Sequence, residues 1–352
     1  MPMGGIRRDD PFGADRTKGA LPPLLRSPPG YFCPDEAGVG LRIAVIGGGL
    51  MGHGIALTFA RAGHDVVVTD PVPEALASLG ARVADSLRLL GADDAEIAAS
   101  VARISTDPGV SGAVAGADVV IEAAPEKLEL KQTIFAEIEA AAPRDAILAS
   151  NTSVIQISKI MGGLKTRERA LGTHWWNPPH MIPLVEVVKT EWTDPGVAEA
   201  MHALLAEVGK TPVMVEKDVP GFIGNRLQHA LWREAVSLVE NGICTAQAVD
   251  DVVKASFGRR LAVLGPLENA DLVGIELTQD IHKQVLFDLD ARGAPSPYLQ
   301  SLLDQGRTGM ASGAGFRDWA EGDLTKTKAR IAEHLSALEA LLLQSNQSEE
   351  EA

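Results

Sequence analysis

The sequence predicts an α/β protein in which a doubly wound parallel sheet is followed by an all-helical C-terminal domain. Two patterns lead to this fold class. Between about residues 41 and 217, short apolar segments alternate with segments of helical periodicity. This alternation is typical of a parallel sheet that is covered by helices on both faces. After about residue 217 the strand-like segments stop, and only helical patterns follow.

The first elements of the sheet domain are a strand, a glycine-rich turn, a helix and a second strand. The first strand covers residues 42–46, and the helix covers residues 50–62 and ends at Gly63, because glycine commonly terminates helices. The second strand covers residues 66–69. The later strands are expected within residues 117–124 and 146–150, which flank a helix at 127–142, and at residues 170–173, 184–188 and 212–215.

Apolar residues at helical spacing predict the elements of the C-terminal domain. A first helix is expected within residues 221–242, where Gly242 ends it. Its apolar positions are Ile223, Leu227, Leu231, Ala235 and Leu238. Thr245 is expected to cap the next helix, and further helical patterns cover residues 268–290 and 324–345.

These patterns divide the chain into four parts. Residues 1–40 are rich in proline and glycine and have no periodicity, so we expect a flexible arm. The sheet domain is assigned to residues 41–217, the helical domain to residues 218–330, and a helical tail to residues 331–352.

The amino-acid composition limits the kinds of molecule that this protein is expected to bind. The 352 residues carry a formal net charge of −15 at pH 7, which repels nucleic-acid backbones and anionic membrane surfaces. No apolar run approaches the roughly 20 residues that a membrane-spanning helix needs. Cys33 and Cys244 have no metal-ligand spacing and fit a reducing compartment. We therefore expect a cytoplasmic protein that binds a small molecule and holds no metal.

A glycine motif lies between the first strand and the first helix. The stretch GGGLMG fits the pattern G-x-G-x-x-G, which in this context binds the pyrophosphate of a dinucleotide. Gly47 makes the tight turn, Gly49 lets the backbone approach the pyrophosphate, and Gly52 lets the helix pack closely on the strand. Leu50 and Met51 open the helix, whose N-terminus faces the anion. The alternative is a glycine-rich turn without a ligand.

An acidic residue ends the second strand. Asp70 follows Gly52 by 18 positions, which is close to where dinucleotide-binding domains carry a carboxylate that accepts hydrogen bonds from ribose hydroxyls. This carboxylate repels a 2′-phosphate, so the sequence predicts NAD and not NADP as the cofactor. His53, next to the motif, is expected to lie on the helix surface without a role.

A histidine and a glutamate stand out in the segment HWWNPPHMIPLVEVV. His174 follows a predicted strand, and Glu186 lies 12 positions later within the next one. A base and the carboxylate that orients it would explain this pair, whereas the alternative is a loop histidine and a structural glutamate. Ser153 follows another strand and would lie near the carboxyl edge of the sheet, where ligands bind. Asn225 lies in the first turns of the helical domain.

Taken together, these segments resemble the L-3-hydroxyacyl-CoA dehydrogenase family. The matching stretches are GGGLMGHGIA, SNTS, HWWNP with the later LVEVV, PGFIGNRL and SGAGFRDW, in this order over about residues 41–319. The resemblance implies a Rossmann-type NAD domain, a helical domain that forms a homodimer, and a catalytic His–Glu pair.

The resemblance also implies roles for individual residues. It makes His174 the general base and Glu186 its partner, and it places Ser153 and Asn225 beside the substrate oxygen. Three further residues match cofactor contacts of the family: Glu126, Lys131 and Asn177.

The chemistry of alcohol oxidation agrees with these roles. Hydride transfer from a secondary alcohol needs a base for the hydroxyl proton, and imidazole is suited to this near neutral pH. A carboxylate on the far ring nitrogen sets the tautomer and stabilises the imidazolium. Serine and asparagine side chains can donate hydrogen bonds to the developing ketone oxygen. Trp175 and Trp176 are expected to serve for packing.

The chain departs from the family where acyl-CoA would bind. Family members that take CoA carry lysines in the segment after the second strand, whereas residues 71–105 hold Arg82, Arg88 and Arg103 but no lysine. Ala311 also stands where the family usually has a lysine. The stretches NPPHMIPLVEVV and GPLENADLVGIELTQD instead resemble the lambda-crystallin/L-gulonate 3-dehydrogenase and carnitine dehydrogenase-like branch, whose members oxidise free hydroxy acids. The HWWNPPH stretch also resembles a pyridine-carboxylate dehydrogenase.

We therefore predict NAD-dependent oxidation of a 3-hydroxyl group in a 3-hydroxy carboxylic acid or its CoA thioester, with a slight preference for the free acid. One alternative is an NAD-binding structural protein similar to lambda-crystallin, which the presence of all four candidate catalytic residues disfavours. The other is a lysine-dependent β-hydroxyacid dehydrogenase, which needs a lysine where this chain has Asn225 and Arg226.

Overall fold

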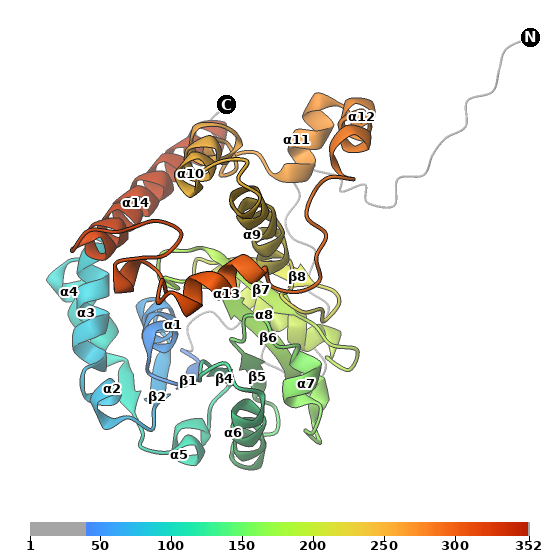
Figure 1. The fold of residues 1–352 in the computed structure, drawn as a ribbon. Helices are drawn as coiled ribbons and strands as arrows, with labels where there is room; N and C mark the ends of the chain where they lie inside the picture. Colours follow the sequence, from blue (N-terminus) through green and yellow to red (C-terminus); the bar gives the residue numbers. More distant parts are fainter. Residues whose placement is uncertain (1–39, 351–352) are drawn as a thin grey trace, which may run out of the picture.

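The computed structural model describes residues 40–350, so the expected N-terminal arm lies, except for Gly40, outside the described residues. Within this range the chain forms a sheet domain followed by a series of helices (Figure 1). None of the described helices is long and apolar enough to cross a membrane.

In the described part of the chain, eight strands form one sheet in the order β3-β2-β1-β4-β5-β6-β7-β8. The strands are β1 Arg42–Ile46, β2 Asp65–Thr69, β3 Ile104–Thr106, β4 Val119–Glu122, β5 Ile147–Ser150, β6 Ala170–Trp175, β7 Leu184–Val188 and β8 Thr211–Val215. The strand order changes direction between β1 and β4. The carboxyl ends of these two strands therefore flank the crevice where doubly wound sheets bind ligands.

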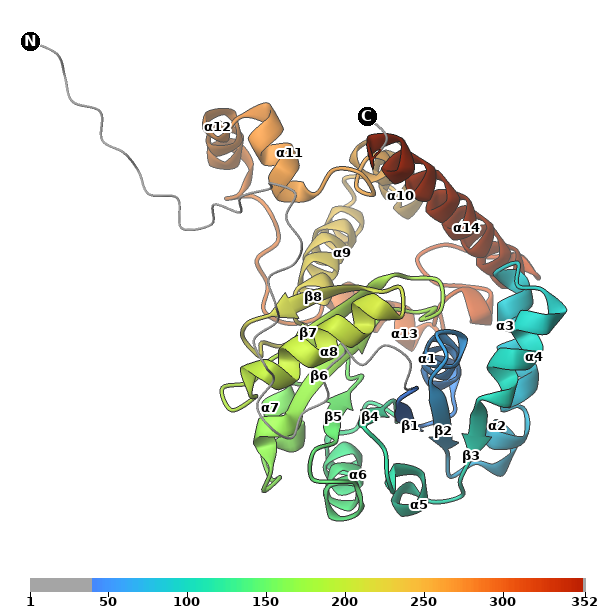
Figure 2. The ribbon, with the colours of Figure 1, turned by 180° about the vertical axis from the view of Figure 1, so that it is seen from behind.

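Helices cover both faces of the sheet. They are α1 Leu50–Arg61, α2 Pro73–Ala77, α3 Leu79–Leu89, α4 Asp94–Ala102, α5 Val110–Val114, α6 Leu128–Ala141, α7 Ile157–Met161 and α8 Pro195–Glu207. In β1, Ile43 and Val45 share a core with α1, α3, α4 and α8, whereas Ala44 and Ile46 share a core with α5, α6 and α7. Figure 2 shows α8 lying over β6 and β7. The doubly wound α/β sheet predicted from the sequence is confirmed.

The sheet is mixed, however, and not purely parallel as predicted. Strand β7 runs antiparallel to β6, whereas the other neighbouring strands are parallel. Residues 176–183 alone connect β6 to β7, and such a connection is too short for the crossover that parallel strands require. Strand β6 also continues to Trp175, so His174 lies within the strand and not after its end.

The helices after β8 leave much apolar surface uncovered. They are α9 Gly224–Glu240, α10 Ala246–Ala255, α11 Pro266–Val273, α12 Ile275–Val285, α13 Pro297–Asp304 and α14 Asp323–Glu350. Thr245 accepts a hydrogen bond from the N–H of Ala248 and so caps α10, as predicted. Helices α10, α11 and α12 bury none of their residues, and α11 and α12 stand away from the sheet in both views (Figures 1 and 2). Helix α14 is continuous across residues 330 and 331, where the sequence suggested a boundary.

Candidate active site

His174 and Glu186 lie directly opposite each other in β6 and β7. The antiparallel register pairs Gly172 with Val188 and His174 with Glu186, and opposed residues project from the same face of a sheet. His174 Nδ1 and Glu186 Oε2 are 2.6 Å apart, and both side chains are buried. The separation of 12 positions in the sequence therefore follows from the register of this antiparallel pair.

The Glu186 carboxylate also binds the start of helix α9. Its Oε1 atom accepts hydrogen bonds from the N–H groups of Ile223 (2.8 Å) and Gly224 (3.0 Å). Burial acts to raise the pKa of Glu186, but the hydrogen bonds from His174 and from these N–H groups lower the pKa below its usual value. The carboxylate is thus held in its charged form between the imidazole and the helix N-terminus, where the helix dipole favours negative charge.

Two aromatic rings lie beside the imidazole of His174. The ring centroid of Trp176 lies 5.3 Å from that of His174, and the centroid of Phe222 lies 5.6 Å away. Gly224 allows α9 to approach this wall, since a Cβ at that position would lie 2.4 Å from the indole of Trp176. Trp175 is buried in the core of the sheet domain. Both tryptophans therefore serve for packing, as expected from their size.

The structure brings Ser153 and Asn225 together. Asn225, in the first turn of α9, donates a hydrogen bond from Nδ2 to the backbone oxygen of Ser153 (2.8 Å). Asn225 is buried, whereas Ser153 is exposed in the loop that follows β5. Helix α9 therefore contacts both Glu186 and the Ser153 loop, and it joins two parts of the candidate site that are distant in the sequence.

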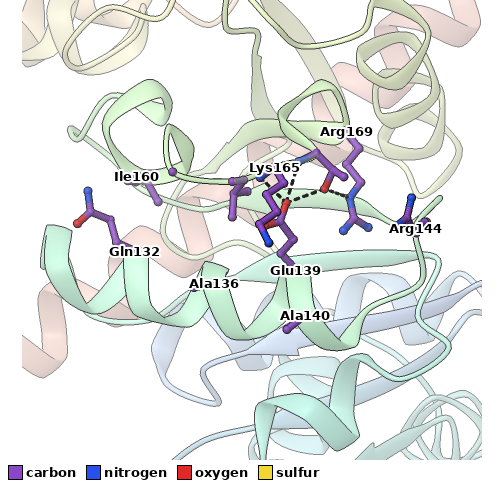
Figure 3. Close-up of a pocket in the computed structure, with 11 residues that line it drawn as sticks. Gln132, Ala136, Glu139, Ala140, Arg144, Ile160, Lys165 and Arg169 are labelled. Carbon is purple, nitrogen blue, oxygen red and sulfur yellow. Dashed lines mark hydrogen bonds between the residues drawn. The ribbon is translucent and has the colours of Figure 1, made fainter.

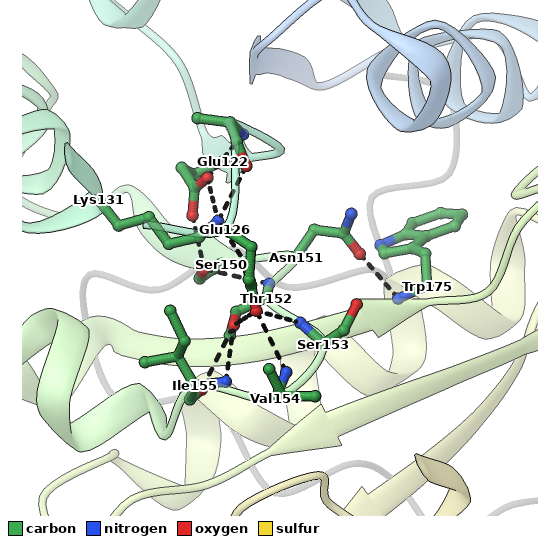
Figure 4. Close-up of polar contacts among 11 residues, drawn as sticks. Glu122, Glu126, Lys131, Ser150, Asn151, Thr152, Ser153, Val154, Ile155 and Trp175 are labelled. Carbon is green, nitrogen blue, oxygen red and sulfur yellow. Dashed lines mark hydrogen bonds and ion pairs between the residues drawn. The ribbon is translucent and has the colours of Figure 1, made fainter. Parts of the chain in front are cut away.

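Glu126 holds the Ser153 loop (Figure 4). Its Oε1 atom accepts hydrogen bonds from Thr152 Oγ1 (2.5 Å) and from the N–H groups of Ser153 (3.0 Å) and Val154 (3.2 Å). Burial acts to raise the pKa of Glu126, but the Thr152 hydroxyl, the Lys131 charge and the two N–H groups lower the pKa below its usual value. The charged carboxylate therefore fixes the backbone around Ser153.

Lys131 links Glu126 to a second, wholly buried carboxylate. Its Nζ atom lies 2.6 Å from Glu122 Oε1 and 3.3 Å from Glu126 Oε2, and Ser150 Oγ donates to Glu122 Oε2 (2.6 Å). The Lys131 side chain is only 1% exposed. The cofactor contacts expected of Lys131 and Glu126 therefore stay predictions. Glu122 was not among the predicted residues, although a carboxylate that ends the apolar strand VVIE is a signal for it.

The glycine turn has the geometry that a dinucleotide site needs. Gly47 has a φ angle of 110°, which favours glycine, and a Cβ on Gly52 would lie 1.7 Å from the oxygen of Gly47. Nothing lies within 4 Å of the Cβ position of Gly49. This leaves space for a ligand in front of α1, which Leu50 and Met51 begin.

Asp70 lies beside this turn at the end of β2. Its Oδ2 atom accepts a hydrogen bond from the N–H of Gly48 (2.7 Å), and its Oδ1 atom accepts one from the N–H of Val72 (2.8 Å). A carboxylate has about four acceptor positions, so about two remain besides these backbone contacts. The expected contact of Asp70 with the ribose of the cofactor stays a prediction. Within the described residues there is no group of three or more His, Cys, Asp or Glu side chains that could hold a metal ion.

Asn177 lies exposed at the start of the loop of residues 176–183, just before a cis peptide bond to Pro178. Lys210 holds this loop by donating from Nζ to two of its backbone oxygens, at distances of 2.6 and 3.1 Å. The expected contact of Asn177 with the cofactor stays a prediction.

His53 is buried, so its expected place on the helix surface is wrong. Its Nδ1 atom lies 3.2 Å from the oxygen of Gly49, and its Nε2 atom lies 3.3 Å from Ser86 Oγ of α3. The ring centroid of His180 is 5.8 Å away. Helix α3 and the loop of residues 176–183 cover this face of α1, and the resulting burial lowers the pKa of His53. The apolar pattern of one helix does not show which other segments will pack against its polar face.

A separate hollow of about 710 Å³ lies between α6 and residues 160–169 (Figure 3). Its residues Arg144 and Arg169 lie just before β5 and β6, so the hollow is at the amino ends of these strands. The candidate active site is at their carboxyl ends. Glu139 in this hollow accepts hydrogen bonds from the backbone of Lys165 and from the N–H and hydroxyl of Thr166, each 2.8 Å long.

Two family models together match most of the chain. The model described as "3-hydroxyacyl-CoA dehydrogenase, NAD binding domain" matches residues 42–219, and "3-hydroxyacyl-CoA dehydrogenase, C-terminal domain" matches residues 221–319. The boundary between the two models lies next to the division between the sheet domain and the helical domain.

Several named proteins are similar to this chain over most of its length. A 5-formyl-3-hydroxy-2-methylpyridine 4-carboxylate 5-dehydrogenase of Mesorhizobium japonicum is 34% identical over 85% of this chain and 97% of that protein. An L-carnitine dehydrogenase of Streptomyces griseus is 38% identical over 67% of this chain and 70% of that protein. The mitochondrial hydroxyacyl-coenzyme A dehydrogenase of Homo sapiens is 35% identical over 78% of this chain and 90% of that protein.

A solved structure is similar in fold as well. The crystal structure of a 5-formyl-3-hydroxy-2-methylpyridine 4-carboxylic acid 5-dehydrogenase, described as an NAD+-dependent dismutase, superposes with a TM-score of 0.80 at 34% identity. The match covers 86% of this chain and 99% of that chain.

Proposed function

Because the chain belongs to the 3-hydroxyacyl-CoA dehydrogenase family and is thus an NAD-dependent oxidoreductase, we propose that it oxidises the 3-hydroxyl group of a free hydroxy acid, with His174 as the general base. The contact that carries this proposal is the 2.6 Å hydrogen bond between His174 and Glu186. It gives Nδ1 of the imidazole a charged partner and leaves Nε2 to take the hydroxyl proton. NAD, bound at the glycine turn and Asp70, supplies the hydride acceptor.

The groups around His174 support this proton transfer. The charged Glu186 stabilises the imidazolium that forms, because the N–H groups of α9 keep its carboxylate ionised. The exposed hydroxyl of Ser153 can donate a hydrogen bond to the substrate oxygen. The Asn225 amide has a second N–H besides the one that binds the Ser153 backbone, and this second N–H is proposed to donate to the same oxygen.

The charges of residues 71–105 favour a free acid over a CoA thioester. This segment has no lysine, and each of its three arginines forms an ion pair or hydrogen bonds with other groups of the protein. Arg88 contacts Asp85 at 2.6 Å, Arg103 contacts Asp65 at 3.0 Å, and Arg82 donates to backbone oxygens. Of these three, only Arg82 keeps a positive charge without an acidic partner among the described residues, so the phosphates of CoA would find little positive charge in this segment. Carnitine, which gives several of the similar proteins their name, is itself a free 3-hydroxy acid.

The substrate class is tested with matched pairs of free acid and thioester. Rates of NADH formation are compared for 3-hydroxybutyrate and 3-hydroxybutyryl-CoA, with carnitine and gulonate as further acids and His174→Ala as the blank. We expect kcat/KM for the best free acid to exceed that for the thioester by about tenfold or more, a difference in transition-state binding of about 1.4 kcal/mol. A higher value for the thioester would contradict the free-acid proposal and leave the proposed role of His174 in place.

We also propose a homodimer that forms through residues 218–330. Large apolar side chains of α11, α12 and the segment after α12 are exposed, and Leu267 and Phe287 reach 81%. Burying such side chains against a second copy would be favourable by about 25 cal/mol per Å². Sedimentation at micromolar concentration should therefore give twice the chain mass of 37.1 kDa.

The interface can be tested by substitution. We expect Leu267→Asp with Phe287→Asp to give a monomer, while Leu89→Asp, at an exposed position of the sheet domain, should remain dimeric. A wild-type monomer, or dissociation by the control variant alone, would count against this interface.

A further inference from the structure

Arg82 of helix α3 reaches back to the glycine turn. Its Nη2 atom donates to the oxygens of Gly48 (2.7 Å) and Ala75 (2.6 Å), and its Nη1 atom lies 3.3 Å from the oxygen of Gly49. A single guanidinium thus binds two consecutive carbonyls of the turn and one carbonyl of α2.

Arg82 has no acidic partner among the described residues, in contrast to the other arginines of residues 71–105. Arg88 pairs with Asp85, and Arg103 pairs with Asp65. Carbonyl partners leave the full positive charge of Arg82 in place, within a chain of net charge −15. This charge acts at the glycine turn: burial lowers the pKa of His53, which contacts Gly49, and the Arg82 charge lowers it further.

Holding a carbonyl oxygen also orients the N–H group of the same peptide. The peptide unit is planar and trans, so its C=O and N–H bonds point in opposite directions. The oxygens of Gly48 and Gly49 share their peptides with the N–H groups of Gly49 and Leu50. These N–H groups begin α1, where the helix offers them no carbonyl, and such groups bind the pyrophosphate in dinucleotide sites.

We propose that Arg82 is a positioning residue for NAD, which holds the carbonyl side of the glycine turn and so orients the N–H groups of Gly49 and Leu50 toward the pyrophosphate. The proposal rests on NAD binding, which follows from the family of the chain. It does not depend on which acid is the substrate or on the role of His174. Because Arg82 holds three backbone oxygens and the Ser78 hydroxyl through a planar guanidinium, both its charge and its shape contribute.

The test compares Arg82→Met with Arg88→Met, which removes an arginine from the same helix without touching the turn. Calorimetric titrations of the full chain give Kd for NADH, ADP-ribose and adenosine, and steady-state rates give KM for NAD and kcat. For Arg82→Met we expect the Kd values of NADH and ADP-ribose to rise by about 10–100-fold, because the N–H groups of Gly49 and Leu50 are then no longer held in place and the charged pyrophosphate loses a hydrogen bond from the turn. Adenosine has no pyrophosphate, so its Kd should change less than about twofold.

The kinetic constants separate positioning of NAD from damage to the reaction. The loss in Arg82→Met should appear in KM for NAD, with kcat at saturating NAD lowered by less than about threefold. Arg88→Met should leave all three Kd values within about twofold of the wild type, as is usual for a surface substitution.

Arg82→Lys keeps the charge but not the planar arrangement of donors, so its Kd for NADH should lie between those of the wild type and Arg82→Met. Equal shifts in Arg82→Met and Arg88→Met would overturn the proposal. Equal weakening of adenosine and ADP-ribose would do the same, as would wild-type NADH affinity in Arg82→Lys. If Arg82→Met does not fold, Arg82→Lys and Arg88→Lys are compared by the same titrations, and the same outcomes decide.

Discussion

Replacing His174 with alanine is expected to lower kcat by roughly 10²–10⁴-fold, the usual contribution of a positioned general base. The affinity for NADH should change by less than about threefold, because the imidazole contacts Glu186 and two aromatic rings and not the glycine turn. Turnover is measured with the best acid of the substrate panel, and NADH binding by fluorescence titration. Near-normal turnover in His174→Ala would assign the pair a structural role.

Glu186→Gln should also be slow, for a reason that its contacts define. The carboxylate accepts one hydrogen bond from His174 on Oε2 and two from N–H groups on Oε1. A glutamine that keeps its oxygen on the N–H groups must turn its NH2 group toward His174 Nδ1. This favours the tautomer that carries its proton on Nε2, which cannot accept a proton from the substrate.

The double variant then tests whether the two residues act as one unit. Once His174 is alanine, the charge of Glu186 has no imidazolium to stabilise. We therefore expect His174→Ala with Glu186→Gln to be slower than His174→Ala by less than about threefold, because residues that act as a unit are non-additive. Independent multiplication of the two losses would contradict this coupling.

Replacing Lys131 with methionine is expected to lower the free energy of unfolding of the sheet domain by about 3–5 kcal/mol. The Glu122 side chain is 0% exposed, and Lys131 is its cationic partner at 2.6 Å. Without Lys131 the Glu122 carboxylate is buried with no counter-charge, and Glu126 loses a partner as well. Urea unfolding followed by tryptophan fluorescence measures the change.

Two variants show whether the uncompensated charge is the cause. Lys127→Met removes an exposed lysine from the N-terminus of the same helix and should change the free energy of unfolding by less than about 0.5 kcal/mol. Glu122→Gln in the Lys131→Met background removes the lone charge, so the double variant should be more stable than Lys131→Met alone. A double variant that is less stable than either single variant would point to packing as the main contribution.

Elements with a strong local pattern were predictable to within a residue or two. The first strand was expected at residues 42–46 and is Arg42–Ile46, and the strand expected at residues 184–188 is Leu184–Val188. The glycine motif was equally readable, because the tight turn at Gly47 and the close packing at Gly52 each require the absence of a side chain. Such features depend on residues that are neighbours in the sequence, so a short stretch of sequence is enough to predict them.

The hydrogen-bond and ion-pair partners of polar side chains could not be predicted from short sequence patterns. The sequence placed Glu126, Lys131 and Ser153 near the site, but the ion pair of Lys131 with Glu122 arises only when β4 and α6 are packed together. Nothing in the sequence distinguished Arg82 from the other two arginines of residues 71–105, yet of the three only Arg82 contacts the glycine turn. Burial of His53 depends on α3 and on the loop of residues 176–183, which the helix periodicity of α1 does not encode.

By itself, the sequence determined the α/β class, the change to helices after residue 217 and the glycine turn with Asp70, because periodicity, spacing and residue type carry this information. The roles of the four candidate catalytic residues followed from the resemblance to a known family and stay predictions. Only the tertiary structure decided that β7 reverses direction, and with it the register that sets His174 opposite Glu186. The docking of α9 then supplied the N–H groups that keep Glu186 charged and the Asn225 contact with the Ser153 loop. These contacts join residues 37 or more positions apart or depend on a choice of strand direction. They form only when burial of apolar surface selects one packing, and no local pattern specifies that selection.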